Sequence, residues 1–176
     1  MTIAYQGVEG AFGHEACLRF MPGHPPVPFD TFSAVVAAVQ CGDADFGMLP
    51  VANNEAGETG ARELIEKARL RIVEEPVLAV RMHLLGLPGS TLSQIRAVVS
   101  HPVALRQCAK TLAALGVATE ETSNTALAAK ALTNPNRAVL ASEAAADLYG
   151  LSILKRDVHD RADNATRFAI VARDAQ

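Results

Sequence analysis

The chain has 176 residues, of which 49% are hydrophobic and 20% are charged, and its formal net charge is -3. This composition is that of a folded globular protein, and it excludes a disordered, collagen-like or low-complexity chain. The 16 basic residues are scattered among 19 acidic ones, so we expect no nucleic-acid partner.

The sequence carries no signal for export, membrane insertion or metal binding. Its first residues run directly into a short apolar strand, and no apolar stretch approaches the ~20 residues of a membrane-spanning helix. We therefore expect a cytoplasmic protein with no membrane partner. Cys17, Cys41 and Cys108 lie far apart and the five histidines lack ligand spacing, so we expect buried, reduced thiols and no metal.

The first half of the chain alternates between short apolar strands and amphipathic helices, as in α/β proteins. We expect strands at residues 2–6, 46–49 and 70–73, and helices at 14–20, about 31–41 and 61–68. The proline-rich segment 22–28 and the polar segment 51–60 are expected to be irregular. Residues 77–87 are expected to form one extended strand.

The second half has the pattern of a doubly wound α/β unit, with helix-capping residues after the strands. Strands are expected at residues 95–99, 117–121, 137–141, 152–157 and 168–172, and helices at 102–115, 125–132 and 143–149. Pro102 suits a first helical turn, and Gly116 and Gly150 suit the position after a helix end.

Four strand-to-helix junctions are candidate anion sites, because each offers backbone N–H groups at the positive end of a helix dipole. They are residues 10–13, 100–102, 123–125 and 141–143. Each junction is also explained by simple helix capping, for which Ser and Asn are favoured.

The segment Asp-Asn-Ala-Thr-Arg-Phe at residues 163–168 places a hydroxyl and a guanidinium before the last apolar strand. Arg167 suits a bidentate contact with a carboxylate, and Thr166 can donate a hydrogen bond to an oxygen. The alternative is an Asx turn followed by an exposed arginine. No Walker, G-x-G-x-x-G or G-x-S-x-G motif is present, so the residues alone predict an α/β protein with an anion-binding cleft.

Five segments, taken together and in order, resemble the catalytic domain of the prephenate dehydratase family. They are Tyr-Gln-Gly-Val-Glu-Gly-Ala-Phe at 5–12, Pro-Val-Ala-Asn-Asn at 50–54, Ser-His-Pro-Val-Ala-Leu-Arg-Gln-Cys at 100–108, Ala-Ser-Glu-Ala-Ala with Leu-Tyr-Gly-Leu at 141–151, and Asn-Ala-Thr-Arg-Phe at 164–168. The third and the last are highly characteristic of that family, and the resemblance covers essentially the whole chain.

The resemblance implies a two-lobed α/β fold of the periplasmic-binding-protein type (type 2), with the active site in the cleft between the lobes. Residues 1–76 and 161–176 would form the first lobe, and residues 77–160 the second. Because residue 176 follows soon after the last expected strand, we expect the family's carboxy-terminal ACT domain to be absent. The resemblance is also consistent with a homodimer.

In that family prephenate loses carbon dioxide and its ring hydroxyl to give phenylpyruvate, a step of phenylalanine biosynthesis that needs no cofactor. The resemblance implies a small-molecule substrate, prephenate or the related arogenate. It assigns catalytic roles to four residues: Thr166, which is the essential hydroxyl, Asn53, Gln107 and Ser100. The substrate-binding residues that we expect are Arg167, Asn164, Ser142, Thr125, Gly10 and Ala11.

One motif departs from the family pattern. The family's Glu-Asn-Ser reads Ala-Asn-Asn at residues 52–54, so the one carboxyl group expected near the site is missing, and Glu55 would replace it only if the loop were shifted. A threonine hydroxyl alone is a weak acid. Two alternatives therefore stay open: a non-aromatising prephenate decarboxylase, and a catalytically silent protein that binds a small anion.

Overall fold

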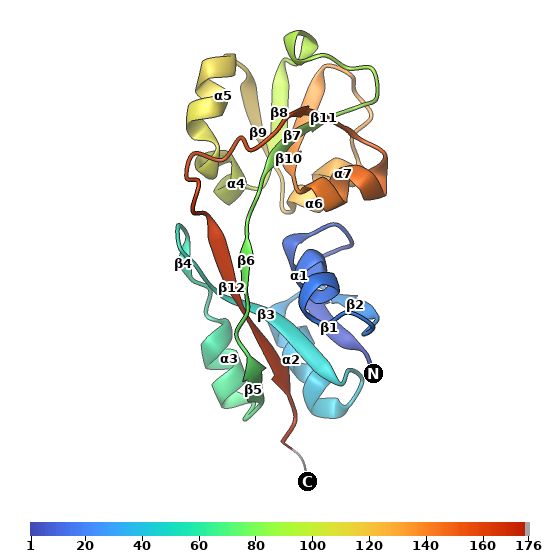
Figure 1. Ribbon diagram of the computed structural model, residues 1–176, viewed down its shortest axis with the longest axis vertical. Helices are drawn as coiled ribbons and strands as arrows, with labels where there is room; N and C mark the ends of the chain where they lie inside the picture. Colours follow the sequence, from blue (N-terminus) through green and yellow to red (C-terminus); the bar gives the residue numbers. More distant parts are fainter. Residues whose placement is uncertain (175–176) are drawn as a thin grey trace. The chain divides into compact units, whose positions relative to one another are not determined.

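The computed structural model describes residues 1–174, and the chain divides into two compact units (Figure 1). Unit 1 comprises Met1–Ala79 and Ala165–Gln176, and unit 2 comprises Val80–Asn164. Both boundaries lie a few residues later than expected, because residues 77–79 pair with the strand that begins at Ala165. Residues 175–176, which belong to the expected first lobe, lie outside the described residues.

Unit 1 is built on a seven-stranded mixed sheet. Its main strand order is β2 (Pro26–Phe29), β1 (Ile3–Gln6), β3 (Phe46–Asn53), β12 (Ala165–Ala172) and β5 (Arg71–Glu74), with β4 (Gly57–Glu58) paired to β3 and β6 (Val77–Ala79) paired to β12. Strands β1, β2 and β3 are parallel, whereas β12 runs antiparallel to β3, β5 and β6. Strand β12, which follows all the other strands in the sequence, therefore lies between β3 and β5 inside the sheet of unit 1.

Three helices cover the two faces of this sheet: α1 (Phe12–Phe20), α2 (Phe32–Cys41) and α3 (Ala61–Lys67). Helix α1 packs on the face that carries Tyr5, Leu78 and Phe168. Helices α2 and α3 pack on the other face, which carries Leu49 and Val171. Side chains alternate between these two apolar clusters along β12, as a strand buried on both faces requires.

Unit 2 is built on a five-stranded sheet in the order β11 (Ser152–Lys155), β7 (His83–Gly86), β10 (Arg137–Ala141), β8 (Ala97–Ser100) and β9 (Ala118–Glu121). Strands β8, β9 and β10 are parallel, and β7 runs antiparallel to both β10 and β11. Its helices are α4 (Pro102–Gln107), α5 (Ala109–Leu115), α6 (Thr125–Lys130) and α7 (Glu143–Tyr149), with a 3-10 turn, η1 (Leu92–Gln94). Helices α4, α6 and α7 all begin where the parallel strands end.

The helix-end signals in the sequence are confirmed. Thr31, Asn124 and Ser142 cap α2, α6 and α7 through their side chains, Pro102 is the first residue of α4, and Gly42, Gly116 and Gly150 adopt left-handed conformations after α2, α5 and α7. These signals act within one turn of chain, so tertiary context does not override them.

Two segments with prolines differ from expectation, because they belong to the sheet of unit 1. Residues 26–29 form β2, an edge strand paired only with β1, where the missing N–H of proline is tolerated. Strand β3 runs through Pro50 to Asn53 instead of ending at Leu49. Its register with β12 shifts beside Pro50, and such a bulge accommodates a residue that cannot donate to the ladder.

Two long expected elements are each divided in the structure. Residues 77–87 form two short strands, β6 in unit 1 and β7 in unit 2. The helix expected over 102–115 breaks at Cys108 into α4 and α5. Asp160 explains the break, because its N–H donates to Gln107 O at 2.7 Å and its carboxylate accepts from Lys110 N at 3.1 and 3.2 Å.

Two further expectations are corrected. Strand β12 begins at Ala165, so Thr166 and Arg167 are strand residues and not part of an Asx turn before the strand. Cys41 is exposed at the end of α2, whereas Cys17 and Cys108 are buried as expected. Among the described residues, no helix is long and apolar enough to cross a bilayer.

Candidate active site

Asn53 and Thr166 face each other across the β3–β12 ladder. The Asn53 Nδ2 group donates to Thr166 Oγ1 at 2.9 Å and to Ala165 O at 3.0 Å. Its Oδ1 atom accepts from the backbone N–H groups of Glu55 at 3.0 Å and Ala56 at 2.8 Å. Only the amide oxygen can accept these bonds, so the nitrogen must face Thr166. Thr166 Oγ1 is therefore an acceptor toward Asn53, and its own O–H is a donor for another group.

Thr166 and Arg167 lie on opposite faces of β12, because successive side chains of a strand alternate. Thr166 is paired with Leu78 of β6, which is fully buried on the face that α1 covers. Arg167 is paired with Val77 and lies on the face of α3. The sequence led us to expect the Thr166 hydroxyl and the Arg167 guanidinium on one side of the chain. The structure instead places them on opposite faces of the sheet.

The Arg167 guanidinium lies near Glu75 instead. Its Nη1 atom is 3.9 Å from Glu75 Oε2, while Arg62 of α3 binds the same carboxylate in a bidentate manner at 2.6 and 3.2 Å. The hydrogen bond from Arg62 holds the pKa of Glu75 below its ordinary value, and the charge of Arg167 adds to this effect. The Arg167 side chain is half-exposed, and its predicted role as a carboxylate anchor stays a prediction.

Ala52, the position that departs from the family pattern, shares a face with Arg167. It is paired with Arg167 on one side and with Glu58 of β4 on the other. A carboxyl group at this position would consequently lie on the face opposite Thr166. Glu55, the substitute considered from spacing, is exposed in the turn that joins β3 to β4.

Gly10 and Ala11 lie at the start of α1, on the same face of the sheet as Thr166. The Gly10 N–H donates to His14 Nδ1 at 3.2 Å, and the His14 ring lies against Tyr5 with ring centroids 5.5 Å apart. Burial lowers the pKa of His14, partly offset by the charge of Glu9, which favours the neutral ring that this bond requires. The N-cap residue of α1 is Ala11, and no side chain caps this helix.

The predicted residues of unit 2 gather where its parallel strands end. Ser100 is fully buried at the end of β8 and donates to Leu140 O at 3.3 Å. Ser142 caps α7 by accepting from Ala145 N at 3.1 Å. Thr125 is the first residue of α6, whose cap is Asn124. The capping explanation is therefore realised at Ser142 and at Asn124, whereas the cap of α4 is His101, whose Nδ1 atom accepts from Val103 N at 3.2 Å, and not Ser100.

Gln107 and Asn164 are both buried in unit 2. Gln107 closes α4, and its backbone oxygen accepts from Asp160 N. Asn164 is the last residue of the unit, and its backbone oxygen accepts from Val80 N at 2.8 Å. The structure therefore groups Thr166, Asn53, Gly10 and Ala11 in unit 1 and the other predicted residues, apart from Arg167, in unit 2. Their meeting on one ligand stays a prediction.

Two side chains near the predicted residues were missed by the sequence analysis. Asn54 entered only as a departure from the family motif, yet its Oδ1 atom accepts from Ala165 N at 2.9 Å. His83, paired with Ala141 at the strand end of unit 2, is only 3% exposed, and its Nδ1 atom accepts from Asp157 N at 3.0 Å. Long-range contacts of this kind leave no signal in the local sequence. For His83 there is only a weak signal, which is a histidine at the first position of an apolar strand.

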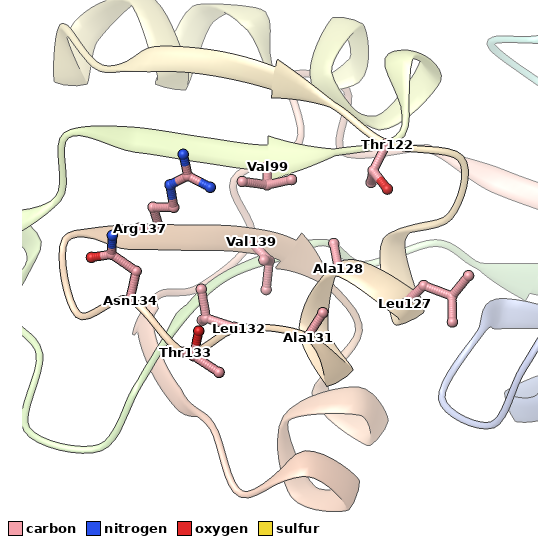
Figure 2. Close-up of a pocket in the computed structure, with 10 residues that line it drawn as sticks. All are labelled: Val99, Thr122, Leu127, Ala128, Ala131, Leu132, Thr133, Asn134, Arg137 and Val139. Carbon is pink, nitrogen blue, oxygen red and sulfur yellow. The ribbon is translucent and has the colours of Figure 1, made fainter.

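A separate pocket of about 290 Å³ lies in unit 2 between α6 and the strands β8 and β10 (Figure 2). It is lined by Val99, Thr122, Leu127, Ala128, Ala131, Leu132, Thr133, Asn134, Arg137 and Val139. Arg137, the one charged residue of this lining, is bound to Glu120 at 2.9 Å. None of the predicted site residues lines this pocket. Across residues 1–174, no group of three or more His, Cys, Asp or Glu side chains is arranged to hold a metal ion.

The two α/β units define the class of the fold. The structure aligns with a periplasmic substrate-binding protein of an ABC transporter from Coxiella burnetii over 99% of the chain, with a TM-score of 0.52 at 12% identity, which concerns the fold alone. It is thus a periplasmic-binding-protein-like fold. The prephenate dehydratase family model matches residues 3–176, and the chain belongs to that family.

Three similar proteins place the chain within the family. Arogenate dehydratase/prephenate dehydratase 2 of Arabidopsis thaliana, a chloroplastic protein, is 40% identical over 99% of this chain and 47% of its own length. The structure of GqqA, described as a novel type of quorum-quenching acylase, is 38% identical and aligns with a TM-score of 0.91 over the whole chain and 65% of its own. Prephenate dehydratase from Arthrobacter aurescens in complex with L-Phe is 28% identical, also with a TM-score of 0.91, over the whole chain and 61% of its own. The chain thus spans about half the length of the curated relative and under two thirds of these structures.

Proposed function

We propose that the chain catalyses the decarboxylation and dehydration of prephenate to phenylpyruvate in phenylalanine biosynthesis, with arogenate as the alternative substrate. Family membership supports this activity for the domain that the relatives share. One observation carries the proposal: Thr166 Oγ1 accepts from Asn53 Nδ2, which turns the threonine O–H into a donor toward a ligand.

The proposed reaction needs few reactive groups, because it forms an aromatic ring. The electron pair of the bond to the ring carboxylate moves into the ring, carbon dioxide leaves, and the ring hydroxyl departs as water after taking up one proton. Prephenate thereby gives phenylpyruvate, carbon dioxide and water. Departure of the hydroxyl is the step that a protein donor can assist.

Thr166 is suited to assist that departure. A hydroxyl that accepts a hydrogen bond is polarised and becomes a better donor, by about 10–30% per bond in condensed-phase estimates. Because threonine is a weak acid, we propose that Thr166 stabilises the leaving oxygen by a hydrogen bond. Water then supplies the proton that the leaving oxygen takes up. A positioned donor of this kind contributes about 10²-fold to 10³-fold in rate.

The carboxylates of the substrate require other donors. The start of α1 suits one of them, because no side chain caps this helix and its dipole favours an anion. The backbone N–H groups of Gly10 and Ala11 donate to His14 Nδ1 and to Val8 O, so we propose substrate contacts at the start of α1 beside these two residues. The other substrate contacts stay predictions: Arg167, Ser100, Gln107, Thr125, Ser142 and Asn164.

An assay of the purified protein tests the proposal. Prephenate and arogenate are supplied separately, and products are followed by ultraviolet absorbance and mass spectrometry. Phenylpyruvate from prephenate, or phenylalanine from arogenate, supports dehydration. A dihydro-hydroxyphenylpyruvate would instead identify a non-aromatising decarboxylase, and binding without turnover would identify a silent anion-binding protein.

An acylase activity is a second candidate, because GqqA, which is described as a quorum-quenching acylase, is 38% identical over the whole chain. Incubation with an N-acyl-homoserine lactone, followed by mass spectrometry for the released fatty acid, tests it on the same preparation. A homodimer and a cytoplasmic location stay predictions from the sequence, and sedimentation and cell fractionation test them.

A further inference from the structure

The side chain of Asn54 closes the end of the β3–β12 ladder. Its backbone N–H donates to Ala165 O at 3.1 Å, and its Oδ1 atom accepts from Ala165 N at 2.9 Å. In a regular antiparallel pair, backbone groups make both of these bonds. Here β3 ends at Asn53 and the chain turns toward β4, so the side-chain carbonyl of Asn54 stands in for its own backbone carbonyl.

Ala165 is the residue directly before Thr166, and Asn53 and Asn54 hold both of its backbone groups. Its carbonyl accepts from Asn54 N and from Asn53 Nδ2, and its N–H donates to Asn54 Oδ1. The N–H and C=O of one strand residue point to the same side, so those of Ala165 face β3 and those of Thr166 face β6. Ala165 thus holds the first residues of β12 against the end of β3, where Asn53 lies.

We propose that Asn54 is a positioning residue for the Thr166 hydroxyl, an inference that rests on the proposed dehydratase function. By fixing Ala165, Asn54 keeps Thr166 Oγ1 within 2.9 Å of Asn53 Nδ2 at a strand end that would otherwise fray. Serine, the residue of the family motif at this position, has a shorter side chain and lacks a carbonyl. Asn54 acts on the reaction through the placement of Thr166.

Two variants and a matched control test the proposal with prephenate and arogenate. Asn54→Ala removes the acceptor, and we expect kcat to fall about tenfold while KM stays within about twofold, because displacement of a reacting group costs rate more than binding. Asn54→Asp keeps an acceptor at the same place and restores kcat. Asn134→Ala is the control, because Asn134 Oδ1 makes the same kind of bond, to Asn136 N at 2.9 Å, in unit 2.

Amide hydrogen exchange supplies a readout that does not depend on activity. The Ala165 N–H exchanges faster in Asn54→Ala than in the wild type, and Asn54→Asp restores its protection. The proposal is overturned if Asn54→Ala keeps kcat within twofold, if Asn54→Asp is as slow as Asn54→Ala, or if Ala165 exchange is unchanged. A wild-type protein that turns over neither substrate overturns the proposed function. In that case the exchange rate of the Ala165 N–H in Asn54→Ala still tests whether Asn54 holds Ala165 in place.

Discussion

The Asn53 amide donates to Thr166 Oγ1 at 2.9 Å, and the backbone N–H groups of Glu55 and Ala56 prevent this amide from turning over. The hydroxyl therefore has a fixed donor on one side and directs its proton elsewhere. Asn53 and Thr166 are 113 residues apart in the chain, but they lie on strands that are adjacent in the sheet.

Thr166→Val keeps the shape of the side chain and removes the hydroxyl. We expect kcat for dehydration to fall by at least about 10²-fold, the lower bound for loss of one hydrogen-bond donor to a developing negative charge. Thr166→Ser, which keeps the hydroxyl, retains most of the activity. Steady-state kinetics and circular dichroism check this prediction, and a valine variant within threefold of the wild type would remove Thr166 from its assigned role.

Ala52→Glu restores the carboxyl group of the family motif at a position that faces Arg167 and Glu58. Attraction to Arg167 and repulsion from Glu58 oppose each other, so we expect the free energy of unfolding to change by less than about 1 kcal/mol. Dehydration stays within about twofold, because the new group lies on the face opposite Thr166. Denaturant titration and the kinetic assay measure both quantities, and a large gain in kcat would contradict the assignment of faces.

Acid sensitivity is expected from His83. Burial lowers its pKa below the ordinary 6.5; Asp157 and Glu143 oppose this, and Arg156 and His159 add to it. As the pH falls below 6.5, the unfolded chain binds the proton first, so stability is full above that value and declines toward the folded-state pKa.

His83→Asn keeps an acceptor for the Asp157 N–H and cannot titrate. We expect its denaturation midpoint to vary less between pH 7 and pH 5 than that of the wild type, over the range in which histidine titrates. Some dependence remains, because burial also lowers the pKa of His14. Identical pH profiles for the two proteins would contradict the prediction.

The three thiols should differ in reactivity toward a water-soluble aryl disulfide such as dithiobis(nitrobenzoate). Burial raises the pKa of Cys17 to about 12, and Cys108 is also buried, whereas Cys41 is exposed. Since the thiolate is the reactive form, we expect one fast-reacting thiol in the native protein and three after denaturation. Cys41→Ser abolishes the fast phase, and a variant that keeps it would show that a buried thiol becomes accessible.

The sequence predicts the α/β class and the helix ends well, because Thr31, Ser142 and Gly150 act through contacts within one turn. Resemblance to the family adds Thr166 and Asn53, which the structure joins directly. The position of Arg167 on the face opposite Thr166 was not predicted, because it depends on the alternation of faces along a strand that begins earlier than its apolar run. The Asp160 contacts that divide α4 from α5 span about fifty residues, and no local pattern encodes them.

The place of β12 has a consequence for biosynthesis on the ribosome. Residues 80–164 form a unit whose strands are all contiguous in sequence, so it can acquire its structure as soon as it emerges. The earlier-made strands β3, β5 and β6 must wait for β12 to be translated, with their pairing edges open in the meantime. Unit 1 is therefore completed after unit 2, and the hydroxyl of Thr166 arrives together with the strand that completes it.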